Sequence, residues 1–384
     1  MQRGDPLELT RTLVRIDSRN PSLVPGAPGE AEVARVLAFV LDDWGFNVEL
    51  MDSGSGRPNV IARAGTSGGS SLMFNGHLDV VGTEGMIHTP FDGIETSGRL
   101  YGRGATDMKG GVAAMCAAAV RALDAGMSGE IIICAVADEE YRSVGTSALI
   151  HKGVRADAAI VTEPTCMTIA PAHKGFVWFD VTVTGRSAHG SRYDLGVDAI
   201  KHAGLLLAEL NQLESEVLSK ATHPLLGHAS LHASLIEGGT GMSTYPDRCV
   251  VKLERRTVPG EDESAALKQI RDACARVKSR QPSFDASVTV EFAQVPSDVA
   301  TDSRIVRALE RAMRAEGEAV LTTGLSAWTD AALLNAAGIP AICYGPGDIA
   351  LAHAAEEYVV LDEISRACNV LTRLALEWSR GVRD

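Results

Sequence analysis

The run from Ile131 to Ala137 is almost entirely apolar, which is typical of a strand buried on both faces of a sheet. Leu72 to Phe74 and Ala158 to Thr162 have the same character. Between the strands at Phe74 and Ile131, Gly110 to Ala125 reads as a helix of small residues that can pack closely on a sheet. Buried strands that alternate with helices predict an α/β fold, a mostly parallel sheet flanked by helices.

The middle of the chain has a different pattern. Val177 to Thr184 alternates between β-branched or aromatic residues and other residues, which predicts a half-exposed strand. The elements that follow it give the order βαββαβ, a ferredoxin-like unit complete in itself. A chain of 384 residues is also long enough for two domains. We therefore predict a discontinuous catalytic domain, 1–174 and 297–384, with an inserted α+β domain, 175–296.

The composition limits the partners and the compartment. A formal net charge of -13 argues against nucleic acid or an anionic membrane as the main partner. The seven cysteines are odd in number and widely spaced, which favours buried, reduced thiols over disulfides or a cysteine metal site. The N-terminal residues lack the apolar core of a signal peptide, and no run approaches the roughly 20 apolar residues of a membrane span. We expect a cytoplasmic protein.

Side chains of metal-ligand type follow three of the predicted strands. His77 and Asp79 follow the first, Glu139 and Glu140 the second, and Glu163 the third. Ligands of open α/β sheets bind outside the carboxyl ends of the strands, so these groups are predicted to meet at one site. Imidazole and carboxylate bind zinc and similar divalent ions. Each motif alone has an ordinary explanation, but three strands that deliver such groups to one edge indicate a metal site.

Neighbouring residues of this predicted site are expected to have different roles. Side chains two apart in a strand point the same way, so the Asp79 carboxylate is expected to accept a hydrogen bond from His77 and fix its tautomer. At the exit of a buried strand, the side chains of Glu139 and Glu140 point differently. One of them can bind metal while the other faces the substrate as a base.

Further candidates lie outside these strands. Asp107 stands in a glycine-rich turn before a helix and is either a bridging ligand or a helix cap. His353 follows a rigid Gly-Pro-Gly loop and is either a ligand or an ordinary surface histidine. In the inserted domain, His189 is no obvious metal ligand, and the adjacent Arg255 and Arg256 either bind substrate or form a solvated basic pair.

One motif competes with the metal site. Residues 65–69 fit Gly-x-Ser-x-Gly, the nucleophile-elbow pattern, with Ser67 as the nucleophile. A true elbow has a strand before it and a helix after it, whereas a strand follows here. We therefore expect a flexible loop at this position. The alternative is a serine hydrolase that is indifferent to chelators.

Several segments together resemble the co-catalytic zinc family of aminoacylases, dipeptidases and glutamate-type carboxypeptidases. The similarity is greatest to the branch of acetylornithine deacetylase and succinyl-diaminopimelate desuccinylase, and it covers essentially the whole chain. The segments that carry it are 75–81 (Asn-Gly-His-Leu-Asp-Val-Val), 101–111 (Tyr-Gly-Arg-Gly-Ala-Thr-Asp-Met-Lys-Gly-Gly), 137–140 (Ala-Asp-Glu-Glu), 162–165 (Thr-Glu-Pro-Thr), 185–190 (Gly-Arg-Ser-Ala-His-Gly), 245–248 (Tyr-Pro-Asp-Arg) and 345–348 (Gly-Pro-Gly-Asp) with His353.

The resemblance implies a centre of two divalent metal ions, zinc in the first place, with cobalt and manganese as alternatives. His77 and Glu163 would bind one ion, Glu140 and His353 the other, and Asp107 would bridge both. The family also implies a non-proline cis peptide after Asp107. The catalytic domain would have a zinc-peptidase-like fold, and the inserted domain would act as its lid.

The resemblance also assigns catalytic roles. Asp79 would orient the neighbouring histidine ligand, and Glu139 would be the general base. His189 would reach the scissile carbonyl from the inserted domain, in many relatives across a dimer interface. Closure of the inserted domain would then be part of turnover.

Substrate binding is assigned to Arg256, which would hold the amino-acid carboxylate, and to Ser243 and Gly345. The chain departs from many relatives at two places. Residues 239–245 lack an asparagine that relatives carry there, and residues 85–91 lack a tryptophan. These departures leave the metal ligands unchanged and bear on the identity of the substrate.

The predicted function is the hydrolysis of an N-acyl amino acid, as in an acetylornithine deacetylase of amino-acid metabolism such as arginine biosynthesis. The family alternatives are a succinyl-diaminopimelate desuccinylase and a dipeptidase or carboxypeptidase. The substrate would be a small N-acyl amino acid or a dipeptide, and the protein a homodimer formed through the inserted domain. A non-catalytic binding protein on the same fold is a third alternative, although all the proposed ligands and the base are present.

Overall fold

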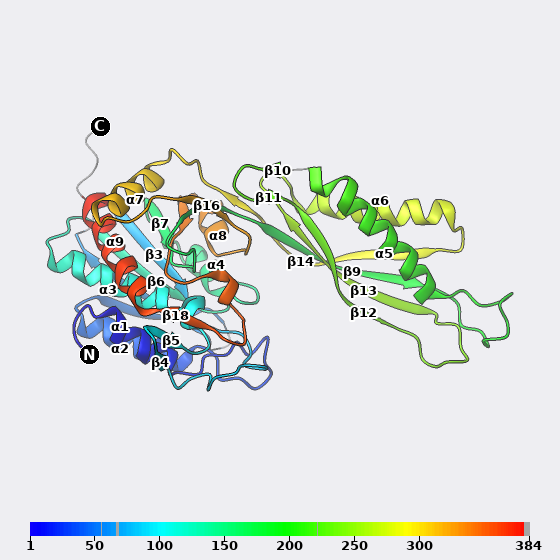
Figure 1. Ribbon diagram of the computed structural model, residues 1–384, viewed down its shortest axis with the longest axis horizontal. Helices are drawn as coiled ribbons and strands as arrows, with labels where there is room; N and C mark the ends of the chain where they lie inside the picture. The colour runs from blue at the N-terminus through cyan, green and yellow to red at the C-terminus, as the bar shows by residue number, and fades with distance from the viewer. Residues whose placement is uncertain (55, 67–68, 221, 380–384) are drawn as a thin grey trace. The chain divides into compact units, whose positions relative to one another are not determined.

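The computed structural model describes residues 1–54, 56–66, 69–220 and 222–379. The chain forms two compact units (Figure 1). Unit 1 contains Met1–Pro171, Val299–Thr323 and the chain from Thr329 onward, and unit 2 contains Ala172–Asp298 and Gly324–Trp328. The sequence placed this last segment in the first domain. It groups with unit 2 because the Trp328 ring packs edge-on against Phe176 and its Nε1 donates to the Val295 carbonyl.

The main sheet of unit 1 confirms the predicted α/β class. Its central strands β6, β3, β7 and β17 are parallel, and β1, β2 and β8 run antiparallel to their neighbours at the two edges. The sequence did not reveal β8 or the antiparallel edges. The strands lie in the order β1 (Asn47–Asp52), β2 (Pro58–Gly65), β6 (Glu130–Val136), β3 (Ser71–His77), β7 (Ala158–Val161), β17 (Ala341–Cys343), β8 (Ile169–His173) and β15 (Ser297–Asp298). A further strand, β16 (Thr322–Leu325), also pairs with β8.

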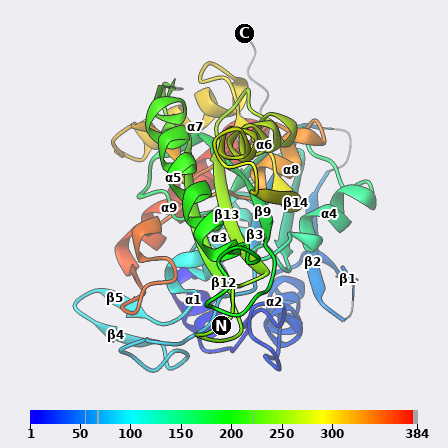
Figure 2. The same cartoon turned by 90° about the vertical axis from the view of Figure 1, so that its right-hand side faces the viewer.

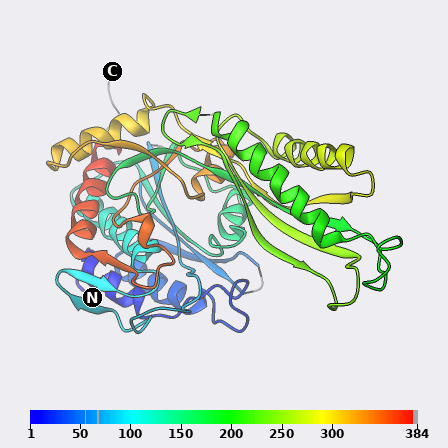
Figure 3. The ribbon, with the colours of Figure 1, turned by 45° about the vertical axis from the view of Figure 1, so that its right-hand side comes forward.

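Helices cover both faces of this sheet (Figure 3). One cluster of buried residues joins five helices to alternate sheet residues such as Leu72 and Phe74. The intervening sheet residues, such as Met73 and Ile132, are buried on the other side, where two short helices contact each other. The five helices are α1 (Pro6–Val14), α2 (Ala31–Asp43), α3 (Gly110–Asp124), α7 (Arg304–Ala315) and α9 (Leu361–Ser379), and the two short ones are α4 (Val144–His151) and α8 (Ala331–Ala336).

The small residues of α3 allow an unusually close approach to the sheet. A Cβ at Gly111 would lie 2.0 Å from the main-chain oxygen of Thr162, directly before Glu163. Only glycine fits this position, because any side chain would push the helix away from the end of β7. The close approach of α3 therefore holds it against the main chain directly before Glu163.

Unit 2 is a ferredoxin-like unit, as the order of its elements predicted. Four antiparallel strands lie in the order β12-β13-β9-β14, and α5 and α6 lie side by side on one face (Figures 1 and 2). Alternate β9 residues such as Phe179 and Val181 pack against apolar residues of both helices. The elements are β9 (Gly175–Thr184), α5 (Ala199–Glu216), β12 (Ser230–Gly238), β13 (Arg248–Thr257), α6 (Glu263–Arg280) and β14 (Asp285–Gln294).

Short elements complete the two units. A small sheet in the order β18-β5-β4 lies beside the π-helical turn η1 of unit 1. The bounds are β4 (Ile94–Thr96), β5 (Arg99–Tyr101), η1 (Ala105–Lys109), η2 (Leu218–Lys220), β10 (Thr222–His223), β11 (Gly227–His228), β15 (Ser297–Asp298), β16 (Thr322–Leu325), η3 (Ile349–Leu351) and β18 (Tyr358–Val360).

Two further sequence predictions can be compared with the structure. All seven cysteines are free thiols, and six are buried as expected, whereas Cys166 is exposed. Among the described residues, no helix is both long enough and apolar enough to cross a membrane.

The close approach at Gly111 generates a prediction. Replacement by alanine forces Thr162 or α3 to move, and we expect it to lower the free energy of unfolding by about 1–3 kcal/mol, as overpacked core positions do. Gly204 is the control, because it is exposed within α5 and a Cβ there meets nothing within 4 Å. Gly204→Ala should leave stability unchanged or raise it by up to about 1 kcal/mol. Urea unfolding followed by circular dichroism measures both, and equal effects would contradict the packing argument.

Candidate metal centre

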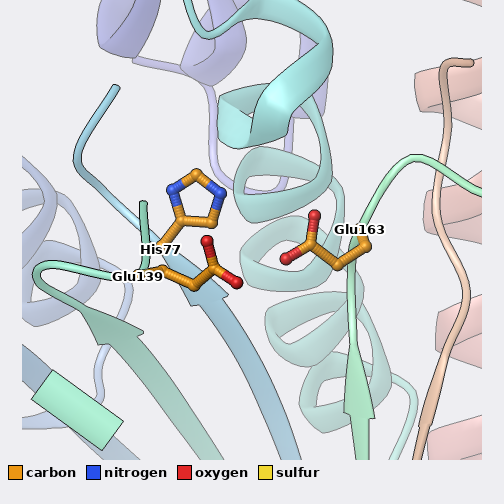
Figure 4. Close-up of side chains that lie close together, drawn as sticks. All are labelled: His77, Glu139 and Glu163. Carbon is orange, nitrogen blue, oxygen red and sulfur yellow. The ribbon is translucent and has the colours of Figure 1, made fainter. Parts of the chain in front are cut away.

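Three of the four central strands, β3, β6 and β7, bring ligand-type side chains together at their carboxyl ends. His77 is the last residue of β3 and only 1% exposed, while Glu139 and Glu163 follow β6 and β7. One ligand atom from each of the three lies within 4.8 Å of the others. Figure 4 shows the three side chains pointing toward one another from neighbouring strands. This is the convergence that the apolar strand runs predicted.

A second group shares the same histidine. Single ligand atoms of His77, Asp107 and Glu140 also lie within 4.8 Å of one another. Oδ1 of Asp107 is 2.9 Å from Nε2 of His77, and Oδ2 is 3.4 Å from Nε2 of His353. The same nitrogen of His353 lies 3.0 Å from Oε2 of Glu140. Asp107 thus stands between two histidines and offers each a different oxygen.

The structure decides two questions that the sequence left open. His353 contacts two site carboxylates and is not an isolated surface residue, although its side chain is 52% exposed. Asp107 is no helix cap, because the residue before α3 is Lys109 and that end has no side-chain cap. The peptide bond between Asp107 and Met108 is cis, as the family resemblance implied.

Asp79 is positioned differently from the prediction. Nδ1 of His77 lies 2.9 Å from the main-chain oxygen of Asp79, whereas the nearest carboxylate oxygen is 3.7 Å away. Asp79 lies beyond the last residue of β3, where the strict alternation of strand side chains no longer holds. Its carboxylate instead accepts hydrogen bonds from the main-chain N–H groups of Glu139 (3.1 Å) and Glu140 (3.2 Å). The carbonyl orients the histidine, and the carboxylate holds the pair of glutamates.

A buried charge network supports the same turn. Asp138 has a left-handed φ of 67°, which is uncommon outside glycine and redirects the chain before the two glutamates. Asn20 donates to Asp138 (3.0 Å) and to Asp79 (2.8 Å). Arg57 forms ion pairs with both Asp138 and Glu30. The turn that directs the glutamates is therefore fixed by residues from three distant parts of the sequence.

The carboxylates of the site repel one another. Burial and the charge of Glu163 raise the pKa of Glu139 well above its usual range, and burial and the charge of Asp107 do the same to the pKa of Glu163. Burial alone would lower the pKa of His77, but the hydrogen bond to Asp107 raises it well above its ordinary value. Contacts with Asp107 and then Glu140 raise the pKa of His353 to about 10. The site therefore favours positive charge strongly.

The donor set fits divalent cations. Oε1 of Glu140 is buried and has no hydrogen-bond partner among the described residues, although an uncompensated carboxylate oxygen is costly to bury. Imidazole nitrogens and carboxylate oxygens in overlapping groups are a composition suited to zinc and similar ions. A cation near these oxygens would compensate both the unpaired atom and the repulsion.

The candidates from the inserted domain lie in unit 2. His189 is exposed, and its Nδ1 lies 2.8 Å from the hydroxyl of Ser191. The carbonyl of Ser243 accepts a hydrogen bond from Gly190 at 2.7 Å, which brings Ser243 next to His189. Two candidates from distant parts of the sequence are thus neighbours in space.

The structure also separates the two adjacent arginines of β13. Arg255 has a side chain only 1% exposed, which pairs internally with Glu261 at 2.5 Å. The Arg256 side chain is 30% exposed and lies over the ring of Phe176. Its Nε donates to Glu254 at 2.6 Å, a contact that does not engage the terminal amino groups. Arg256 is the better placed of the two to bind a ligand.

Gly345 lies in a tightly packed position where a side chain would not fit. A Cβ on this residue would lie 2.5 Å from the oxygen of Thr162, and its N–H donates to the hydroxyl of Thr165 at 3.1 Å. That donor is therefore already engaged, and the glycine is needed for close packing beside Glu163. The rival nucleophile Ser67 lies outside the described residues.

Several residues that shape the site escaped the sequence prediction. All but Arg57, whose side chain is 12% exposed, are buried, and all form polar contacts inside unit 1: Asn20, Glu30, Arg57, Asp138, Asp330 and Glu357. Only Asp138 carried a signal, because it directly precedes the pair Glu139-Glu140. The others are isolated polar residues whose partners lie far away along the chain.

The comparison with known proteins agrees with this geometry. The family model for peptidase family M20/M25/M40 matches residues 73–377. The chain belongs to this family. It is therefore a hydrolase of the M20 group, which acts on amide bonds with the help of metal ions. The family resemblance inferred from the sequence motifs is confirmed.

Similar proteins include both enzymes of the expected branch of the M20 family. The chain is 32% identical to an acetylornithine deacetylase from Myxococcus xanthus over 89% of this chain and 90% of the relative. It is 26% identical to a probable succinyl-diaminopimelate desuccinylase from Staphylococcus epidermidis over 94% of this chain and 95% of the relative. It is also 26% identical to an N-formyl-4-amino-5-aminomethyl-2-methylpyrimidine deformylase from Bacillus subtilis, over 97% and 94%.

Solved structures share the fold at lower identity. An M20 family metallo-carboxypeptidase from Sulfolobus solfataricus superposes with a TM-score of 0.82 and 17% identity, covering 98% of this chain and all of that one. A dinuclear metal-binding peptidase of the M20 family from Bacillus subtilis gives a TM-score of 0.74 and 16% identity, covering 97% of each chain. These likenesses confirm the fold class.

The hydrogen bonds of Asp79 lead to a prediction. Asp79→Asn keeps the shape but places an amide NH₂ where a main-chain N–H now donates, so one of the glutamates loses its anchor. We expect Co²⁺ affinity to fall about 10- to 100-fold while the fold is retained. Equilibrium dialysis measures the affinity, and Asp302→Asn, on the exposed surface, is the control. Unchanged affinity in Asp79→Asn would contradict the anchoring role.

Proposed function

We propose that the chain removes the acyl group from an N-acyl amino acid, in the manner of an acetylornithine deacetylase. The observation that supports this most directly is the pair of ligand groups sharing His77, with Asp107 between two histidines. The 32% identity to an acetylornithine deacetylase over nearly the whole chain favours this substrate class over the succinyl and formyl substrates named for relatives at 26%.

In this proposal the carboxyl ends of the central strands would hold two divalent ions. His77 and Glu163 would hold one, Glu140 and His353 would hold the other, and Asp107 would be a ligand common to both. We favour zinc, with cobalt or manganese as alternatives, because imidazole and carboxylate ligands suit all three. When bound, the ions would polarise the substrate carbonyl and lower the pKa of a water molecule toward neutrality.

Glu139 is the proposed general base. It stands beside His77 and Glu163, and its main-chain N–H donates to Asp79, so its carboxylate is held at the site. We assign it the role of base because the family resemblance gives the ligand positions to Glu140 and Glu163. The carboxylate takes the proton of the attacking water and then delivers it to the departing amine as the C–N bond breaks.

Unit 2 provides the proposed substrate contacts. Arg256 binds the carboxylate of the amino acid, for which the planar guanidinium is suited. Its orientation is already set by Glu254 and the Phe176 ring. His189 donates to the developing oxyanion, and the neighbouring Ser243 contacts substrate. We propose that unit 2 closes over the substrate during turnover, whereas Gly345 acts through packing.

The proposal also includes the oligomeric state of the protein and its location in the cell. In β12, an edge strand of unit 2, Leu235 and Ile236 are 64% and 55% exposed. An unpaired, apolar strand edge is a surface on which a second copy can add its own strand. We propose a cytoplasmic homodimer formed through unit 2.

The metal and base assignments are tested together. Protein loaded with Zn²⁺ or Co²⁺ should release free amine from N-acetyl-ornithine or another N-acetyl amino acid in a panel that includes N-succinyl-diaminopimelate and dipeptides. A chelator should abolish release, and added metal should restore it. Glu139→Gln should lower kcat/KM at least about 100-fold with metal binding unchanged, and exposed Glu356→Gln should not. A fully active Glu139→Gln enzyme would overturn the base assignment, and release that a chelator does not affect would overturn the metal assignment.

The role of Arg256 can be tested by comparing substrates with and without a free carboxylate. For wild type we expect a higher kcat/KM with an N-acyl amino acid than with the corresponding amino-acid amide. Arg256→Met should reduce that ratio about 10- to 100-fold, the value of a charge-assisted hydrogen bond. Exposed Arg271→Met on α6 is the control. An unchanged ratio in Arg256→Met would assign the carboxylate to another residue.

A further inference from the structure

Glu357 is a buried acid for which the proposed mechanism has no task. It lies four residues after His353, directly before β18, and is fully buried. One carboxylate oxygen, Oε1, accepts hydrogen bonds from the main-chain N–H groups of Thr106 (3.1 Å) and Asp107 (3.2 Å). The other, Oε2, accepts from Nη1 of Arg103 at 2.6 Å. Both oxygens are thus used, and each has a different kind of donor.

These bonds connect three segments that carry proposed ligands. Arg103 also donates from Nε to the carbonyl of Gly82 at 2.9 Å, in the loop that follows His77 and Asp79. The carbonyl of Glu357 accepts from the N–H of Gly102 at 3.2 Å, at the start of the turn that carries Asp107. Glu357 itself belongs to the segment of His353. Glu357 and Arg103 together therefore link the surroundings of three of the five proposed ligands, His77, Asp107 and His353.

The turn at Asp107 needs an external acceptor. Asp107 has φ −117° and ψ 93°, which is not helical, and the residue that precedes η1 provides no side-chain cap. The N–H groups of Thr106 and Asp107 are buried, and a buried amide without a partner costs about 1–3 kcal/mol. The carboxylate of Glu357 supplies that partner. It thereby fixes the main chain from which the Asp107 side chain extends.

We propose that Glu357 is a positioning residue of the metal centre, which holds Asp107 so that one carboxylate oxygen faces His77 and the other faces His353. The assignment rests on the proposed function, because it takes Asp107 as the bridging ligand. It requires a carboxylate in particular. Glutamine has one acceptor oxygen, so its NH₂ group must face either Arg103 or the two main-chain N–H groups, and one side of the arrangement is lost.

A matched ion pair in unit 2 separates positioning from general stability. Glu261 accepts from Nη2 of the buried Arg255 at 2.5 Å and from the main-chain N–H of Val258 at 2.9 Å. It therefore has the same kinds of donor as Glu357, but it belongs to the unit that contains none of the proposed metal ligands. Glu261→Gln should cost folding stability without any effect on metal binding.

The experiment is a Co²⁺ titration of the full chain, followed by visible absorption and equilibrium dialysis, with thermal unfolding alongside. Wild type should bind two Co²⁺ ions. Glu357→Gln should bind Co²⁺ about 10- to 100-fold more weakly, with an altered absorption band, while Glu261→Gln should lower only the unfolding temperature. If Glu357→Gln does not fold, Glu357→Asp replaces it, because it keeps the charge beside Arg103 but withdraws the carboxylate by one methylene.

Each outcome has a distinct meaning. Wild-type affinity and an unchanged cobalt spectrum in the folded Glu357 variant would overturn the positioning role. Equal loss of affinity in Glu261→Gln would overturn it too, because the effect would then follow stability. Failure of wild type to bind two Co²⁺ ions would instead refute the proposed metal centre.

Discussion

Mutual repulsion among buried acids is the constraint around which this molecule is organised. The acidic groups come from the ends of three strands and from one turn, and they are Asp79, Asp107, Glu139, Glu140 and Glu163. Such a cluster lowers stability unless positive charge lies between its members. Hydrogen bonds from Asn20 and from the main-chain N–H groups of Glu139 and Glu140 hold the Asp79 carboxylate in place beside these neighbours.

The chain solves this problem with contacts to the main chain. Asp79 binds two main-chain N–H groups, and so does Glu357, in each case beside a proposed ligand. A main-chain donor cannot change rotamer, so the position of the ligand is fixed more firmly than a contact between two side chains would fix it. Hydrogen bonds to main-chain N–H groups thus hold these turns of the site in place, whereas side chains carry its charges.

The sequence could predict the features that depend on local pattern. The apolar run before Glu139 marks a strand buried on both faces, and the alternation of Val177 to Thr184 marks a sheet with one open face. The convergence of His77, Glu139 and Glu163 followed from one rule about where parallel strands end. The hydrogen-bond partner of Asp79 could not be predicted, because β3 ends at His77 and the alternation of side chains stops there. Arg57 and Glu357 were missed because their partners beside the ligands, Asp138 and Asp107, are 81 and 250 residues away in the sequence.

The pairing of β9 with β14 has a consequence for the history of the protein. Phe176, near the start of unit 2, lies opposite Gln294, near its end. The main segment of the inserted unit, Ala172–Asp298, therefore begins and ends at neighbouring positions of one sheet. A unit joined in this way can be exchanged or lengthened in evolution without altering the distance between the two flanking parts of unit 1. New substrate preferences can then arise when unit 2 is replaced, while the strands of unit 1 that carry the acidic residues stay unchanged.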